Sequence, residues 1–172
     1  VLTCVNIYFI TKLLTQKNIA YLAMLIAAFY QPFILYAIVP LKTSFSLFLM
    51  SGVLAMLLFT LNGPHWLKAV ITGIIAGLCL NVRPNSVILL PLVAFFLYRG
   101  CSNRTGNLTK PIIIVIGFAC GFSLAVSPFV IRNHMVAGKL AITTSQLGPN
   151  LYNGFNPLNP EPYYRPTQFA ES

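Results

Sequence analysis

The stretch FSLFLMSGVLAMLLFTL at residues 45–61 contains no charged side chain. At about 1.5 Å of rise per residue, a helix over this stretch is about 25 Å long, close to the roughly 30 Å hydrocarbon core of a bilayer. A helix also satisfies its own backbone hydrogen bonds in lipid, which an open strand does not. The stretch therefore predicts a membrane-spanning helix.

Other apolar segments precede and follow this one, and Pro32 inside one of them predicts a kink within a single span. Together with residues 45–61 they make about six hydrophobic segments, the others being residues 1–14, 19–39, 69–82, 87–98 and 111–131. The pattern predicts an all-α, polytopic transmembrane helix bundle over residues 1–131. Residues 132–172 are polar and are expected to form an external loop or the start of an extramembrane domain.

The segments 69–82 and 87–98 are each short for a membrane span. We interpret them as a helical hairpin that turns at Pro84 and is partly buried in protein. Gly73 and Gly77 have the small-residue spacing that permits close helix contact, although chance produces such a pair equally well.

Composition excludes a soluble domain. Charged residues make up 8% of the chain and hydrophobic residues 57%, whereas soluble domains carry roughly 25% charged residues. The net charge is +9, but the basic residues stand singly at segment ends and form no stripe. We therefore expect no nucleic acid partner, and instead anionic membrane lipid or a phosphate-bearing lipid.

Residues suited to acid–base or metal chemistry are scarce. The chain has no aspartate, and its only glutamates are Glu161 and Glu171 near the C-terminal end. The four cysteines show no metal-binding or redox spacing: three lie in apolar runs, and Cys101 lies in a polar loop predicted over residues 99–110. No metal and no cofactor are expected.

Orientation follows from the alternation of the spans. If residues 15–18 are cytoplasmic, residues 62–68 and 99–110 are cytoplasmic too. The loop predicted over residues 99–110 holds three basic residues, against one in each turn on the other side. Because cytoplasmic loops are enriched in Lys and Arg, this difference favours the same orientation.

Lys42, Arg83 and Arg132 then stand at the external ends of three predicted helices, with no carboxylate nearby in sequence. A cation at membrane depth without a partner is costly, and it is usually functional or extends to the interface. If the three converge, they form an anion site, because Arg binds phosphate bidentately and Lys supplies a point charge. If they do not, they are three separate interface anchors. Spacing alone leaves both interpretations open.

Three stretches resemble family 39 glycosyltransferases. GLCLNVRPN at residues 77–85, followed by ILLPLV at 88–93, resembles the segment around that family's Arg-Pro element. SPFVIRNHMVAG at residues 127–138 resembles its helix-to-loop junction, and TTSQLGPNLYNGFNP at residues 143–157 resembles the loop that follows. The resemblance covers nearly the whole chain, in order.

These are integral-membrane transferases related to protein O-mannosyltransferases and lipid A aminoarabinose transferases. The resemblance implies a multi-pass enzyme, in a bacterial inner membrane, that transfers a sugar from a polyprenyl-phosphate donor at the external face. It also implies an acidic catalytic motif in an external loop that would precede Val1, so we expect a fragment without catalytic residues. Many relatives carry Thr-Glu at the turn where this chain has Lys42-Thr-Ser44.

The expected substrate-binding residues combine phosphate ligands with candidates for sugar contacts: Lys42, Arg83, Asn85, Arg132, Asn133, Tyr152 and Asn156. Preorganised cations would stabilise the charge that develops on the departing phosphate. Tyr152 and Asn156 suit sugar hydroxyls, but packing within their loop explains them equally well. The acceptor is left open. Two other functions fit the same segments: a transporter or flippase of a polyprenyl-linked glycan, and a non-catalytic membrane scaffold.

Overall fold

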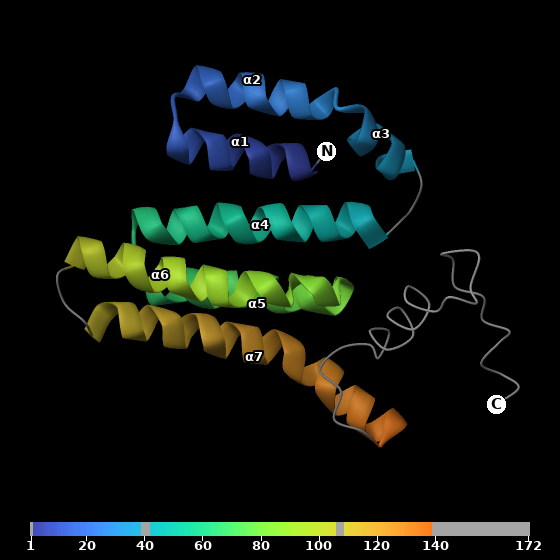
Figure 1. Ribbon diagram of the computed structural model, residues 1–172, viewed down its shortest axis with the longest axis vertical. Coiled ribbons are helices and arrows are strands. Elements are labelled where there is room, and N and C mark those ends of the chain that lie inside the picture. Colours follow the sequence, from blue (N-terminus) through green and yellow to red (C-terminus); the bar gives the residue numbers. More distant parts are fainter. Residues whose placement is uncertain (1, 39–41, 106–108, 139–172) are drawn as a thin grey trace, which may run out of the picture.

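A computed structural model describes residues 2–38, 42–105 and 109–138, and within these ranges every regular element is helical (Figure 1). The elements are α1 (Leu2–Leu14), α2 (Lys17–Ala28), α3 (Gln31–Ile38), α4 (Lys42–Asn62), α5 (Trp66–Val82), the 3₁₀ helix η1 (Pro84–Ile88), α6 (Leu89–Thr105) and α7 (Thr109–Ala137). The predicted all-α transmembrane bundle is confirmed. Three stretches are long and apolar enough to cross a bilayer: Lys42–Asn62, Pro84–Arg104 and Thr109–Val136.

The long helices alternate in direction. Figure 1 shows α2, α1 and α4 stacked in turn, followed by α5 and α6, with α7 on the far side. Buried side chains of α4, α5, α6 and α7 make one apolar core, which includes Val53, Ala76, Val93 and Phe118. The α1–α2 hairpin joins this core through Asn6, whose amide donates to Phe48 O (3.1 Å) and Ser51 Oγ (3.0 Å) on α4.

The span predicted over residues 19–39 is wrong as a single kinked helix. The structure ends α2 at Ala28 and begins α3 at Gln31, so Pro32 lies in the first turn of a new helix. Proline has no N–H, and its ring clashes with the carbonyl four residues earlier, which here belongs to Ala28. In the first turn a missing N–H costs nothing. The helix therefore breaks at Phe29 and Tyr30 and restarts in a form that accepts the proline.

Both predicted boundaries around the last loop are also wrong. α6 continues to Thr105 and α7 begins at Thr109, so most of the polar loop predicted over residues 99–110 is helical, and Cys101 is a buried helix residue. α7 also runs past the predicted end at residue 131 as far as Ala137. Gly138 follows with φ +64° and donates its N–H to His134 O (3.0 Å), as a helix-ending glycine does.

The hairpin at Pro84 is confirmed as a turn between helices, and its first helix, α5, is the one buried in protein. Gly73 and Gly77 lie on the face of α5 that packs against α7, and a methyl group at Gly73 would meet the main chain of Phe118. Gly117 and Gly121 of α7 have the same spacing, and a methyl group at Gly121 would meet the main chain of Val70. Two small-residue pairs thus let parallel helices approach backbone to backbone.

Candidate functional site

The helices bring Lys42, Arg83 and Arg132 to one end of the bundle, which we call the Arg83 end. Lys42 is the first residue of α4, Arg83 follows the last residue of α5, and Arg132 lies near the end of α7. Because α4 runs antiparallel to α5 and α7 runs parallel to it, the start of α4 and the end of α5 lie side by side, and α7 ends on the same side of the bundle with its last turns directed away from it (Figure 1). The opposite end, called the Arg104 end, carries Asn62, Lys68 and Arg104.

The pairing of α5 with α7 sets Arg83 and Arg132 at the same level. Gly77 on α5 faces Ala125 and Val126 on α7. Arg83 lies six residues beyond Gly77, and Arg132 lies six beyond Val126. Arg132 is also seven residues from Ala125, so it continues the side of α7 that packs against α5. Since α5 has ended by then, Arg132 is exposed.

The main chain around Arg83 is held firmly while its side chain is exposed. Arg83 adopts an extended conformation (φ −141°, ψ 103°), as expected for the residue before a proline. Its N–H donates to Cys79 O (2.9 Å). Its carbonyl accepts from the N–H of Ser86 (3.0 Å) and from the Ser86 hydroxyl (2.8 Å). Ser86 is buried, so this turn fixes the Cα position from which the guanidinium extends.

The other predicted site residues are placed less tightly. Asn85 is exposed in η1, next to Arg83, and Asn133 is half-buried on α7. Tyr152 and Asn156 lie outside the described residues. The backbone positions of five predicted residues thus lie at one end of the bundle: Lys42, Arg83, Asn85, Arg132 and Asn133.

Two cationic side chains at the Arg104 end donate hydrogen bonds that stabilise the local structure. Arg104 donates to Asn62 O (2.8 Å) and Asn62 Oδ1 (3.3 Å), which caps the end of α4. Lys68 donates to Gly63 O (3.1 Å) and lies 4.9 Å from the centre of the Phe59 ring. Within the described residues, the side chains of Lys42, Arg83 and Arg132 make no hydrogen bond. Exposed Arg99 at the Arg104 end also makes no side-chain hydrogen bond with the described residues. The Arg83 end therefore differs in that Arg83 and Arg132 lie at the same level.

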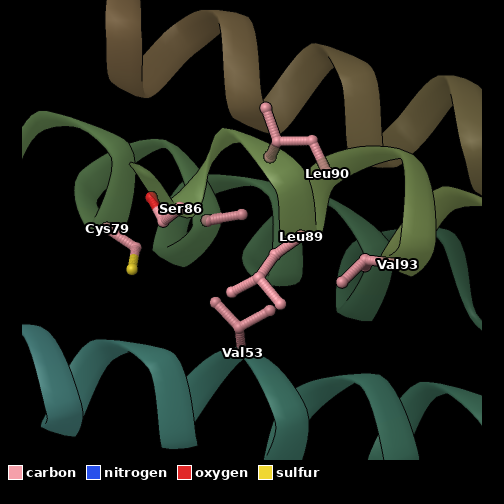
Figure 2. Close-up of a pocket in the computed structure, with 7 residues that line it drawn as sticks. Val53, Cys79, Ser86, Leu89, Leu90 and Val93 are labelled. Atoms are coloured by element: carbon pink, nitrogen blue, oxygen red, sulfur yellow. The ribbon is translucent and has the colours of Figure 1, made fainter. Parts of the chain in front are cut away.

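A cavity lies in the bundle next to the Arg83 end, but its lining does not suit a phosphate. Figure 2 shows the hydroxyl of Ser86 and the thiol of Cys79 on one side and Val53 of α4 opposite. The rest of the lining is apolar: Ala76, Leu89, Leu90 and Val93. The cavity therefore belongs to the helix packing beneath Arg83, and an anion would bind at the exposed cations above it.

Two further residues shape this end and were not predicted from the sequence. Ser86 fixes the turn of Arg83, and Ser127, next to Pro128, donates to Leu124 O (3.2 Å) on α7. The available signal was a serine within two residues of a proline, and an arginine within five residues of the serine, in both cases. Such serines commonly donate a hydrogen bond to a nearby main-chain carbonyl, and this bond helps to set the local backbone geometry.

A comparison with protein families matches residues 1–131 to the model described as dolichyl-phosphate-mannose-protein mannosyltransferase. The matched range includes Lys42, Arg83 and Asn85 and stops just before Arg132. Neither the search of curated proteins nor the search of solved structures finds a match. The match covers most of the chain, which agrees with its apolar helical bundle and makes it an integral membrane protein of the glycosyltransferase type. The chain thus belongs to the dolichyl-phosphate-mannose-protein mannosyltransferase family.

Proposed function

We propose that the Arg83 end binds the phosphate of a polyprenyl-phosphate-linked sugar, and that the enzyme transfers this sugar to an acceptor at the external face of a bacterial inner membrane. The observation that carries the proposal is the common level of Arg83 and Arg132 on the paired helices α5 and α7, with Lys42 at the start of neighbouring α4. Family membership favours such a transferase over a transporter or a scaffold.

The chemistry assigns a role to each group. Negative charge grows on the lipid phosphate as its bond to the sugar breaks, and cations fixed beforehand stabilise that charge. Arg83 and Arg132 supply two planar forks for phosphate oxygens, and Lys42 supplies a point charge. Asn85 and Asn133 contribute amide groups beside the two arginines, and Tyr152 and Asn156 contact the sugar.

The part of the chain that the structure describes contains no carboxylate. This favours the cations, because no described acid competes with the phosphate for them. It also means that the group which accepts the acceptor's proton, normally a carboxylate, comes from outside the described residues. We therefore assign the described bundle to donor binding and to stabilisation of the leaving group.

Substitution in the complete enzyme tests the proposal. Arg83→Ala and Arg132→Ala should each cost about 2–4 kcal/mol of transition-state stabilisation, as removal of one preorganised electrostatic donor does. Arg→Lys at either position should restore activity only in part, since an ammonium does not reproduce the bidentate fork. The measurement is kcat/KM with a labelled polyprenyl-phosphate sugar in liposomes.

Arg99→Ala is the matched control, because Arg99 is an exposed helical arginine at the Arg104 end. It should keep the activity of the unmodified enzyme. Lys68 is less suitable, because its contacts with Gly63 O and the Phe59 ring hold the α4–α5 turn. Full activity in both Arg83→Ala and Arg132→Ala would refute phosphate binding at the Arg83 end.

A further inference from the structure

A proline inside α7 leaves one main-chain carbonyl without its usual donor. Pro128 has no N–H, so it makes no bond to Leu124 O, the carbonyl four residues earlier. The hydroxyl of Ser127 donates to that same carbonyl (3.2 Å). A serine therefore replaces the lost main-chain bond at the point where the proline ring presses on the preceding turn.

α7 is bent, as expected for a helix with a proline in its interior. Figure 1 shows that its C-terminal part turns away from the bundle, and Pro128 lies in the interior of the helix. Sharp helix bends are nearly always caused by such prolines or by a side chain that enters the hydrogen-bond ladder. The part of α7 before the bend is fixed against α5 by Gly117 and Gly121. The bend thus decides where the free end of α7 lies relative to α5.

We propose that Ser127 and Pro128 are positioning residues that set the location of Arg132 relative to Arg83. This inference rests on the proposed function of those arginines. Arg132 follows Pro128 by four residues, or about 6 Å along the helix axis. A change of about 20° in the bend would move its Cα by about 2 Å. A displacement of that size is enough to reduce the rate on the order of 10²-fold when reacting groups must be aligned.

Four variants of the complete enzyme test the inference. Pro128→Ala restores an N–H for Leu124 O, so α7 should straighten and kcat/KM should fall about 10- to 100-fold. Ser127→Ala leaves the carbonyl with no donor and should lower kcat/KM several-fold. Ser127→Thr keeps a hydroxyl and should keep activity. In the double variant the main chain satisfies Leu124 O, so Ser127→Ala should add nothing to the effect of Pro128→Ala.

Thr11 supplies the matched control. Its hydroxyl donates to Ile7 O (2.8 Å), but no proline follows and that carbonyl keeps its main-chain donor within α1. Thr11→Val removes the hydroxyl with little change of shape and should leave kcat/KM unchanged. A loss equal to that of Ser127→Ala would show that removal of any such hydroxyl damages the enzyme, which would overturn the inference.

A distance measurement separates positioning from general damage. Nitroxide labels at Met135→Cys on α7 and Val87→Cys on η1, both exposed positions, report the bend by pulsed electron paramagnetic resonance after the native cysteines are replaced. Pro128→Ala should shift the distance by a few ångströms, and Ser127→Thr should not. Lost activity without a shift, or a shift with full activity, would overturn the inference. If Arg132→Ala is itself fully active, the proposed role of Arg132 fails instead.

Discussion

Asn6 is an amide in the first half of the mostly apolar helix α1. It donates to Phe48 O and Ser51 Oγ on α4, and Ser51 in turn donates to Phe48 O (2.9 Å). In lipid, where apolar surface gives helices little reason to associate, such interhelical hydrogen bonds supply part of the attraction. Asn6 therefore helps to hold α1 against α4, as the paired glycines help to hold α5 against α7.

Replacement of Asn6 with leucine should weaken the attachment of the α1–α2 hairpin. The expected cost is about 0.6 kcal/mol, the average for hydrogen bonds between membrane helices, and at most about 1.7 kcal/mol. Asn18→Leu is the control, because Asn18 is exposed and makes no hydrogen bond with the described residues. Unfolding in mixed micelles measures both free energies, and equal values for the two variants would contradict a specific role for Asn6.

Ser86 matters for a different reason, since it acts on the backbone of another residue. Its hydroxyl and N–H both donate to Arg83 O. Ser86→Ala removes one of these two bonds and buries no new polar atom, so the stability loss should be about 1 kcal/mol. The position of Arg83 should become less defined, which predicts a higher KM for the donor than in the unmodified enzyme. An unchanged KM would show that Pro84 and the main-chain N–H of residue 86 fix the turn without the hydroxyl.

At the scale of single elements, the sequence predicted helices best where side-chain chemistry and helix length agree. Residues 45–61 carry no charge, and Asn62-Gly63-Pro64 ends the helix there, so the prediction placed the end of α4 within one residue and its start three residues late. The predicted segments end too early, at residues 98 and 131, because the polar residues that begin at Arg99 and at Arg132 are typical of loops. A helix that emerges from the lipid continues readily with polar residues, and hydropathy alone carries no signal for where it stops.

Two glycine-to-alanine substitutions, one at the α5–α7 contact and one on α4, should change stability in opposite directions. Gly121→Ala places a methyl group against the main chain of Val70, which has no flexible end to move, so the helices must separate at a cost of about 1–3 kcal/mol. At Gly52 a methyl group would sit 3.6 Å from Asn6 Nδ2 and from Ile75 Cγ2, which is ordinary contact. Gly52→Ala should therefore stabilise α4 by up to about 1 kcal/mol through helix propensity.

Thermal unfolding in one detergent compares these two substitutions directly. The unfolding temperature should fall for Gly121→Ala and should stay level or rise for Gly52→Ala. Equal decreases would mean that glycine serves at both positions for a reason other than close approach of the backbones.

For the whole molecule, the sequence predicted the ends of the bundle better than the contacts between helices. Alternation alone assigned the basic residues to two sets, and the helices place Lys42, Arg83 and Arg132 at the same end. The level shared by Arg83 and Arg132 was not predictable, because it depends on α5 pairing with α7, two helices separated in the chain by α6. The orientation of the bundle in the membrane stays a prediction.

Labelling of introduced cysteines tests that orientation. Val87 at the Arg83 end and Asn103 at the Arg104 end are both exposed, whereas native Cys101 is buried and unsuited to the purpose. In a background without native cysteines, an impermeant thiol reagent added to intact cells should label Val87→Cys. It should label Asn103→Cys only after permeabilisation, because the basic Arg104 end is expected in the cytoplasm. The reverse pattern would invert the topology.

The glycine contact between α5 and α7 has a consequence for biogenesis. At about 5–20 residues per second, the ribosome needs several seconds to extend the chain from Gly73 to Gly121. During this interval α5, with 17 residues, is short for a span and has no partner for its glycine face. We therefore expect α5 to insert less stably than the longer helices until α7 is present. The order of synthesis makes α5 the helix whose insertion depends on a segment not yet made.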